Sequence, residues 1–508
     1  MSEAMGIWTQ RVPGAPILSE ARPEPCALAI LGISGDLAKR KLIPALVNLL
    51  TDELLPENLA VVGVGRRALD LEALRAQLRD GVQRFSRRQP MDDAAWQRVA
   101  ERLFYVAGDY GAAETYQRLG AQLADIDRTL GTQGNRLFYL ATPASAFSDI
   151  IRRLGGGLLH PPGRTPWSRV IVEKPFGHDL ESARQLNDIA AGVLDETQIF
   201  RIDHYLGKET VQNILVLRFG NAIFEPMWNR KYVDHVEITA SEALGLEGRG
   251  RFYDETGALR DMVQSHLLQV LSLVAMEVPV SFRADDVRDQ KVAVFRSLRP
   301  LAGDAALSNT VRAQYRGYRE EPDVAPDSRT PTYVALRVML DNWRWQGVPF
   351  YLRTGKALAA RATEVAIHFH PVPLCLFGRD DVCQRLEPNV LTLRIQPEEG
   401  LSLRITSKIP GQDLAVGGVH MRFDYASGFD QQPQEAYERL LLDALRGDAT
   451  LFWRRDALEQ AWGYVTPILE AWEREPEAAL ATYERGSDGP AEADQLLARE
   501  GRLWSPIR

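Results

Sequence analysis

One stretch near the start of the chain constrains its fold more than any other. Residues 27–31 form an apolar run typical of a buried strand, and a glycine-rich turn ends it. A helix start follows this turn, and a second apolar run at residues 59–62 comes at the spacing of a βαβ unit. Glycines let the backbone approach a pyrophosphate, which the helix N-terminus then stabilises. The stretch therefore predicts a Rossmann-type dinucleotide-binding domain, with cofactor contacts at Gly32, Ile33, Ser34, Gly35, Asp36 and Leu37.

Two arginines after the second expected strand bear on the choice of cofactor. An NAD-binding fold usually places an acidic residue there for the ribose 2′-hydroxyl, whereas this chain has Arg66 and Arg67. An arginine instead favours the 2′-phosphate of NADP, because its guanidinium can donate hydrogen bonds to it. The alternative is that both side chains are solvated in a loop. We expect Arg66 to bind the phosphate and the cofactor to be NADP.

The rest of the first domain continues the alternation of strands and helices. Further strands are expected at residues 103–107, 136–140 and 168–172, and a helix from about 180 to 194 closes the domain. Lys174 follows the last of these strands, at the sheet edge where parallel α/β sheets bind their ligands. We expect Lys174 to reach both cofactor and substrate. An ordinary loop is the alternative for a Lys-Pro pair.

Beyond residue 205 the pattern changes. Strand candidates are separated by long helices and loops, which favours an α+β domain with a mainly antiparallel sheet. These strand candidates are residues 233–240, 333–339, 366–369 and 391–395. Residues 300–330 read as a long polar loop, and charge mixed with alanine from Glu470 onward predicts a partly ordered surface helix and tail.

The length of the chain indicates more than one domain, because 508 residues exceed one ordinary hydrophobic core. We expect a flexible N-terminal arm at residues 1–25, where prolines recur with little periodicity. An NADP-binding Rossmann-type domain at 26–203 follows it. An α+β substrate-binding and oligomerisation domain then occupies 204–508.

Composition argues against several classes of protein. A formal net charge of -8 argues against a nucleic-acid-binding surface. Three cysteines, Cys26, Cys375 and Cys383, are too few for a disulfide framework and suit a reducing compartment, and no spacing resembles a metal site. The most apolar long stretch, 267–280, is shorter than a bilayer span, and no secretory signal is visible. We therefore expect a cytoplasmic protein without a membrane anchor or a nucleic-acid partner.

Residues 201–209, Arg-Ile-Asp-His-Tyr-Leu-Gly-Lys-Glu, gather several groups that serve catalysis or binding. If this stretch opens a helix, His204 and Lys208 lie on one face and form a cationic pair for one anion. Asp203 then lies about 100° away around the helix and has a separate role. The pattern fits a phosphorylated substrate held near an acid–base centre. A solvated helix start is the alternative.

A second informative helix is expected around residues 257–277. Its apolar residues recur at helical spacing, and His266 falls at the edge of this stripe. A satisfied core histidine is the alternative to a catalytic base at such a position. On an α-helix, Asp261 would lie on a different face from His266, so the two residues need not share a partner.

Taken together, these stretches resemble the glucose-6-phosphate dehydrogenase family, in family order and over roughly residues 27 to 485. The resemblance implies oxidation of D-glucose 6-phosphate at C1 to 6-phospho-D-glucono-1,5-lactone with hydride transfer to NADP, the first step of the oxidative pentose phosphate pathway. It also implies a homodimer or homotetramer. The matching stretches are residues 201–209, Gly32-Ile-Ser-Gly-Asp-Leu-Ala38, Val172-Glu-Lys-Pro-Phe-Gly177, Gly248-Arg-Gly250, Arg260-Asp-Met-Val-Gln-Ser-His-Leu-Leu-Gln269 and Gly355-Lys-Ala-Leu358.

The resemblance also implies a role for each matching residue. His266 would be the catalytic base and Asp203 its carboxylate partner, as in other His–Asp pairs. The phosphate would be bound by His204, Tyr205 and Lys208. The sugar hydroxyls would be bound by Lys174, Glu242, Asp261 and Lys356, with Arg361 near the substrate pocket, and the Lys174–Pro175 bond would be cis.

The chain departs from the animal members of that family at a few positions. Ala362 and Ala366 stand where basic residues bind a second, structural NADP, and the C-terminal tail is short. Phe147 replaces a tyrosine that helps to hold the catalytic coenzyme. We therefore do not expect a second NADP site.

Two other functions share part of this pattern. A glucose–fructose oxidoreductase-like protein would also have a Rossmann domain and a Glu-Lys-Pro turn, but it would lack the phosphate-binding stretch at 201–209. A non-catalytic NADP-sensing regulator would lack the base or its carboxylate, whereas His266 and Asp203 are both present. Assays on glucose and glucose 6-phosphate would separate the two enzymes.

Overall fold

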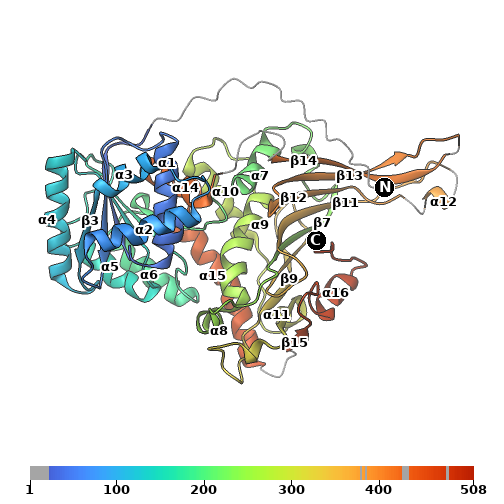
Figure 1. Cartoon of the computed structure of the whole chain (residues 1–508). Helices are drawn as coiled ribbons and strands as arrows, with labels where there is room; N and C mark the ends of the chain where they lie inside the picture. The colour runs from blue at the N-terminus through green and yellow to red at the C-terminus, as the bar shows by residue number, and fades with distance from the viewer. Residues whose placement is uncertain are drawn as a thin grey trace.

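The computed structural model describes residues 22–377, 380–383, 386–412, 414–425, 434–475 and 480–507. Its chain forms two sheets, and Figure 1 shows the smaller sheet with its helices beside the larger one. Most of the arm expected at residues 1–25 lies outside the described residues, which begin at residue 22. Across these ranges, no helix combines the length and the apolar character that a bilayer crossing requires.

The first sheet has six parallel strands in the order β3-β2-β1-β4-β5-β6. Every β1 residue is buried, because helices cover both faces of such a sheet and apolar runs are then favoured throughout. The order reverses at β1, which pairs with both β2 and β4, and parallel α/β sheets bind ligands at this point. The strands are β1 (Cys26–Leu31), β2 (Leu59–Gly65), β3 (Leu103–Ala107), β4 (Arg136–Leu140), β5 (Ser168–Val172) and β6 (Ile199–Arg201).

The predicted Rossmann-type domain is confirmed, since each expected strand is present and a helical segment follows the glycine turn. The helical segments of this half are η1 (Ala38–Leu42), α1 (Ile43–Thr51), α2 (Leu71–Phe85), α3 (Asp93–Glu101), α4 (Ala113–Leu130), η2 (Ala144–Ala146), α5 (Phe147–Leu154), α6 (Leu180–Ala191) and η3 (Glu196–Gln198).

The second sheet has nine strands in the order β14-β13-β12-β11-β7-β10-β9-β8-β15. It confirms the mainly antiparallel sheet, because among its neighbours β7–β10 and β8–β15 pair in parallel and the others pair antiparallel. The strands are β7 (Val233–Ser241), β8 (Thr310–Tyr315), β9 (Tyr333–Met339), β10 (Pro349–Gly355), β11 (Ala362–Phe369), β12 (Val390–Gln396), β13 (Gly400–Lys408), β14 (Val416–Asp424) and β15 (Leu480–Tyr483).

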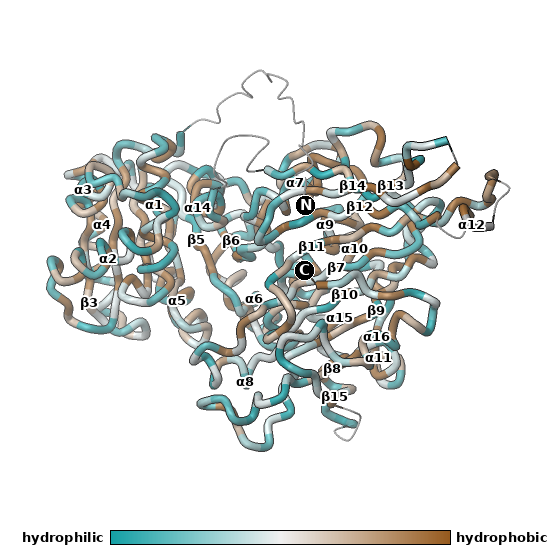
Figure 2. The backbone as a smooth tube through the Cα atoms, turned by 45° about the vertical axis from the view of Figure 1, so that its right-hand side comes forward, coloured by the Kyte–Doolittle hydropathy of each residue, from teal (hydrophilic) through white to brown (hydrophobic). Residues whose placement is uncertain are grey.

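Helices pack against one face of this second sheet. The side chains of Val236 and Ile238 on β7 join the same core cluster as Val263 of η5, and the residues between them point to the opposite face. Hydrophobic segments accordingly run through both sheets, and hydrophilic segments lie along the outer loops (Figure 2). The helical segments are α7 (Glu209–Phe219), η4 (Glu225–Met227), α8 (Gly250–Ala258), η5 (Leu259–Leu267), α9 (Leu268–Ala275), α10 (Ala284–Ser297), α11 (Asp304–Asn309), η6 (Tyr318–Glu320), α12 (Asp380–Cys383), α14 (Ala436–Arg446), α15 (Arg455–Arg474) and α16 (Ala491–Ala498).

One expectation for the second half is wrong, and another holds only in part. Residues 300–330 are not one polar loop, because they contain α11, β8 and η6, and β8 continues the sheet between β9 and β15. The expected C-terminal surface helix is present as α16, but the segment that ends the chain packs more closely than a partly ordered tail would. Leu497 of α16 is fully buried, and the Trp504 ring packs under the Arg353 guanidinium at 4.4 Å.

The cysteines also differ from expectation. Cys375 and Cys383 form a disulfide, whereas Cys26 is a buried free thiol in β1. The Cα atoms of Cys375 and Cys383 lie 5.7 Å apart, a distance that a disulfide spans. A count of three cysteines could not reveal this local approach.

Candidate active site

The side chains expected to form a site meet between the two sheets. Lys174 follows β5 and Asp203 follows β6, both at the carboxyl edge of the parallel sheet. His266 and Asp261 belong to η5 in the second half of the chain. Hydrogen bonds connect these two groups of residues, so the site depends on both halves.

His266 and Asp203 form a buried pair. His266 Nδ1 lies 2.5 Å from Asp203 Oδ1, and the two residues are 0% and 1% exposed. The Tyr205 ring stacks on the imidazole with centroids 4.1 Å apart, which fixes its orientation. Because a carboxylate accepts the Nδ1 proton, Nε2 is the nitrogen that carries the lone pair. The expected dyad is therefore assembled, and its basic atom is identified.

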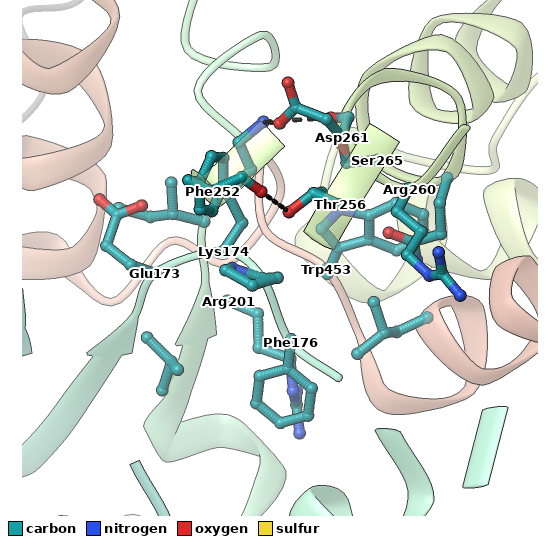
Figure 3. A pocket seen from close by; sticks show the side chains of 15 residues that line it. Glu173, Lys174, Phe176, Arg201, Phe252, Thr256, Arg260, Asp261, Ser265 and Trp453 are labelled. Carbon is teal, nitrogen blue, oxygen red and sulfur yellow. Dashed lines mark hydrogen bonds and ion pairs between the residues drawn. The ribbon is translucent and has the colours of Figure 1, made fainter. Parts of the chain in front are cut away.

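Lys174 connects this pair to η5. Its Nζ lies 2.8 Å from His266 Nε2 and 3.0 Å from Asp261 Oδ1, after a cis Lys174–Pro175 bond. Figure 3 shows Lys174 pointing toward Asp261, while Glu173 points away from it. Both Lys174 and Asp261 line a cavity of about 70 Å³. An ammonium group thus faces the basic nitrogen of His266 directly.

The η5 segment is a π-helix, which the sequence pattern did not predict. In a π-helix the backbone hydrogen bonds join residues five apart, so such residues lie near one face. Asp261 and His266 have this separation, and both contact the Lys174 ammonium group. The expectation that Asp261 lies away from His266 assumed α-helical winding, and it is wrong for that reason.

The ionisation of these groups follows from their burial and their partners. Burial alone would raise the pKa of Asp203 and of Asp261, but His266 outweighs it at Asp203 and lowers that pKa. Lys174 and His266 likewise lower the pKa of Asp261 to about 2. Burial lowers the pKa of His266, and Lys174 lowers it further against the opposing effect of Asp203. At neutral pH the pair is therefore a carboxylate and a neutral imidazole.

Residues 203–208 form a turn, and α7 begins only at Glu209, so the supposed helix start is wrong. Asp203 Oδ1 accepts the Tyr205 backbone N–H at 3.0 Å, which stabilises the turn. A Cβ at Gly207 would lie 2.5 Å from the Ala436 carbonyl oxygen, so only glycine allows this packing against α14. The turn places His204 and Tyr205 beside His266.

His204 and Lys208 do not form the expected cationic pair. Burial, His266 and Lys174 hold the pKa of His204 well below its ordinary value, so its imidazole is neutral. Burial lowers the pKa of Lys208 to about 8, with a further contribution from Arg361. Lys208 and Arg361 both donate to Gln396 Oε1, the latter at 3.4 Å. The cations that converge are therefore Lys208 and Arg361.

Glu242 and Lys356 form a separate pair at the ends of β7 and β10. The Lys356 ammonium donates to Glu242 Oε2 and lies 5.0 Å from the centre of the Tyr253 ring. The Lys356 charge acts on Asp261, and the Glu242 charge acts on Tyr205. This pair accordingly borders the His266 site.

The glycine turn after β1 leaves space at the point where the strand order reverses. Gly32 has a φ of +100°, and a Cβ there would lie 2.3 Å from the Ala141 carbonyl oxygen at the end of β4. The Gly35 N–H donates to the Gly32 carbonyl at 2.9 Å and closes the turn before η1. Ser34, Asp36 and Leu37 follow with partly or fully exposed surfaces, while Ile33 is buried. These features fit a dinucleotide whose phosphates lie against the turn.

Arg66 and Arg67 are exposed directly after β2. No ion pair occupies Arg66 within the described ranges, so its guanidinium is available to an added phosphate group. The Arg67 carbonyl accepts a hydrogen bond from the Tyr105 hydroxyl at 2.5 Å, which holds the loop.

Sequence reasoning missed several residues that shape the site. Gln396 ends β12 and accepts from both Lys208 and Arg361. Lys291 of α10 is 2% exposed, and burial lowers its pKa to about 7 while Asp203 opposes that shift. Glu173 accepts a hydrogen bond from the Tyr139 hydroxyl at 2.5 Å. Gln396 and Lys291 belong to no short motif, so only the fold could reveal them.

A parallel sheet in this strand order, a glycine turn at its reversal and a histidine–carboxylate pair at its edge define a nicotinamide dinucleotide-binding protein of the dehydrogenase type. Family models agree: residues 29–213 match "Glucose-6-phosphate dehydrogenase, NAD binding domain" and residues 215–505 match "Glucose-6-phosphate dehydrogenase, C-terminal domain". The chain belongs to the glucose-6-phosphate dehydrogenase family.

Individual relatives support this assignment over nearly the whole chain. The chain is 44% identical to the glucose-6-phosphate 1-dehydrogenase of Chlamydia pneumoniae, with 95% of this chain and 96% of the relative covered. A crystal structure of the Mycobacterium avium enzyme matches with a TM-score of 0.83 and 40% identity, covering 96% of this chain and 99% of that one. A glucose-6-phosphate dehydrogenase in complex with glucose 6-phosphate matches with a TM-score of 0.86 and 34% identity, covering 96% and 100%.

Proposed function

We propose that this protein oxidises D-glucose 6-phosphate at C1 to 6-phospho-D-glucono-1,5-lactone and transfers the hydride to NADP, the first step of the oxidative pentose phosphate pathway. The observation that carries the proposal is the pairing of His266 with Asp203 and Lys174 at the carboxyl edge of a dinucleotide-binding sheet. The substrate named for a similar structure agrees with it.

The substrate is held at two ends. Lys208, with His204 and Tyr205 beside it, binds the phosphate, and Arg361 converges on the same amide oxygen of Gln396. A charge-assisted contact of this kind contributes about 1.5–3 kcal/mol. The sugar hydroxyls are bound by Lys174, Glu242, Asp261 and Lys356, whose charged groups border His266.

The reaction begins with removal of the C1 hydroxyl proton by His266 Nε2. A hydroxyl held by Lys174 lies next to this nitrogen, because the Lys174 ammonium is 2.8 Å from it. The imidazolium that forms keeps its Nδ1 proton on Asp203, whose negative charge stabilises it. When bound, NADP would accept the hydride that leaves C1. The turn at Gly32 and Gly35 would hold its phosphates, and Arg66 would hold the 2′-phosphate.

The domain limits, the assembly and the location stay predictions. We place the NADP-binding domain at 26–203 and the substrate-binding domain at 204–508. We also propose a homodimer or homotetramer, because β14 is an edge strand on which Val419 and Met421 are 43% and 58% exposed. Light scattering of the purified protein tests the assembly, and a monomer at micromolar concentration contradicts it.

The proposed reaction is tested by following formation of reduced nicotinamide with glucose 6-phosphate and with glucose, using NADP and NAD in turn. We expect glucose 6-phosphate and NADP to give the highest kcat/KM. Equal rates on glucose and glucose 6-phosphate point instead to an oxidoreductase that does not bind a phosphate, and no turnover with either sugar contradicts the proposal.

A further inference from the structure

A second cluster of ligand-type side chains lies on the large sheet, apart from the residues assigned above. It consists of His235 and Glu237 on β7 and His368 on β11, and we name it the sheet-face cluster. His368 is directly opposite His235 in the antiparallel pair, and residues two apart on β7 share a face, so the side chains lie together. One nitrogen or oxygen atom from each lies within 4.8 Å of the others.

The charge of Glu237 requires a positive partner. Glu237 is 1% exposed, and burial of an unpaired carboxylate costs several kcal/mol. Among the ion pairs of the described ranges, Glu237 takes part only in those with His235 and His368, while Arg502 pairs with Asp234. Since neutral imidazoles carry no charge, the positive charge comes from a protonated histidine or from a bound cation.

The spacing of the three groups fits one metal ion. His368 Nε2 lies 3.0 Å and His235 Nε2 lies 3.4 Å from the same oxygen, Glu237 Oε1. Metal–ligand distances of about 2.0–2.1 Å give separations of about 3.3 Å between neighbouring ligands of a tetrahedral zinc site. The two imidazole rings are stacked with centroids 4.1 Å apart, so the His368 ring turns about its Cβ–Cγ bond for both Nε2 lone pairs to point at one ion.

The polar atoms of these side chains that face away from the proposed ion contact other polar groups, as those of metal ligands usually do. His235 Nδ1 lies 2.7 Å from Asp234 Oδ2, and a histidine that donates to a carboxylate in this way presents its Nε2 lone pair to a metal. Glu237 Oε2 accepts the Ser505 backbone N–H at 2.9 Å, and Oε1 is the oxygen that faces both imidazoles. The Ser505 hydroxyl lies 3.5 Å from His368 Nε2 and offers a further oxygen.

We propose that the sheet-face cluster binds one divalent transition-metal ion of the Zn²⁺ type through His235, Glu237 and His368. Two imidazoles and one carboxylate favour Zn²⁺ or Co²⁺, whereas Mg²⁺ and Ca²⁺ prefer oxygen ligands. The ion has a structural role, because Glu237 also holds Ser505 and thereby ties the C-terminal residues to β7. The sequence showed no metal-site spacing because the ligands come from strands far apart in the chain.

The test measures metal binding to the full-length chain after removal of any affinity tag and treatment with EDTA. Co²⁺ is titrated by visible absorption and Zn²⁺ by calorimetry. We expect one ion per chain. His368→Gln and Glu237→Gln should each weaken binding at least about 100-fold, and Asp234→Asn about 10–100-fold. His370→Gln is the matched control, because His370 Nδ1 lies 3.6 Å from Asp234 Oδ1 and His370 is not one of the proposed ligands. The metal affinity of this variant should stay within about twofold of wild type.

Wild-type melting temperatures measured with and without Zn²⁺ keep the proposal testable where a variant fails to fold. An ion that binds the folded chain raises Tm, and Mg²⁺ at the same concentration should not. Unchanged wild-type Tm at saturating Zn²⁺, or equal Co²⁺ affinity of wild type and His368→Gln, overturns the proposal in favour of a protonated histidine.

Discussion

At the scale of single residues, Lys174 decides how the site works. Its ammonium group contacts both His266 Nε2 and Asp261 Oδ1, so one positive charge acts on the imidazole and on a neighbouring carboxylate. Together with burial it lowers the pKa of His266, which keeps the imidazole neutral and able to accept a proton. Burial of His266 thus agrees with a core histidine and with a catalytic base alike, and its partners distinguish the two.

The lowered pKa of His266 predicts the pH dependence of the reaction. A base is inactive when protonated, so kcat/KM should fall only below the ordinary histidine pKa of about 6.5. A profile of kcat/KM against pH measures this limb. Asp203→Asn removes the charge that raises the pKa of His266, so its limb should move to still lower pH while kcat falls. A wild-type acid limb, on which kcat/KM falls as the pH is lowered, with its midpoint above pH 7 contradicts the assignment of His266.

The dyad residues could be named from the sequence only through the family resemblance. Nothing in the spacing of Asp203 and His266 indicates that they touch, because they lie in different halves of the chain. Lys208 and Arg361 were both named as well. Their convergence on Gln396 was not, because a lone glutamine at a strand end carries no signal.

At the scale of elements, continuous apolar strands were the easiest to predict. The parallel strands lie between helix layers, so nearly every residue is apolar and the run stands out, as in β1. Strand β8 was missed because Thr310, Arg312 and Gln314 interrupt it with polar side chains that are buried, so no apolar run marks it. The π-helix η5 was read as an α-helix because both windings give similar apolar stripes over so few turns.

Lys208 lies in the turn before α7, and a variant at this residue is a specific test of phosphate binding. Lys208→Ala should raise KM for glucose 6-phosphate about 10- to 150-fold, which corresponds to the loss of about 1.5–3 kcal/mol. Any weak activity on glucose should stay nearly unchanged, because glucose has no phosphate. Steady-state kinetics on both sugars measure this difference. An equal loss on the two sugars shows that Lys208 has another role.

A conservative variant separates the charge of Lys208 from its packing. Because the pKa of Lys208 is about 8, kcat/KM should decline as pH rises through that value and the ammonium group loses its proton. Lys208→Arg stays charged, so this alkaline limb should disappear from its profile. The same limb near pH 8 in both proteins would assign it to another group.

At the scale of the whole molecule, the two sheets carry different parts of the candidate site. The parallel sheet presents the glycine turn, Arg66 and Lys174, and the larger sheet with η5 presents Glu242, Lys356 and His266. Arg66→Ala should raise KM for NADP about 5- to 30-fold, a loss of about 1–2 kcal/mol for a partly exposed contact, and should barely change KM for NAD. Added salt should weaken NADP binding more than NAD binding.

Titration of both coenzymes against wild type and Arg66→Ala at two salt concentrations checks this prediction. Arg67→Ala is the matched control, since Arg67 is its exposed neighbour and is expected to contribute less. Equal shifts for NADP and NAD would mean that Arg66 supports the loop and does not bind the 2′-phosphate.

Hydride transfer from glucose 6-phosphate with His266 as the base is measured most directly by the kcat of His266→Asn. We expect kcat to fall about 10²–10⁴-fold with little change in glucose 6-phosphate affinity, because general-base catalysis contributes a factor of this size. Asp203→Asn should lose less, since His266 remains but loses its orientation and charge stabilisation. If both variants turn over glucose 6-phosphate at the wild-type kcat, the His266–Asp203 pair is not the catalytic centre.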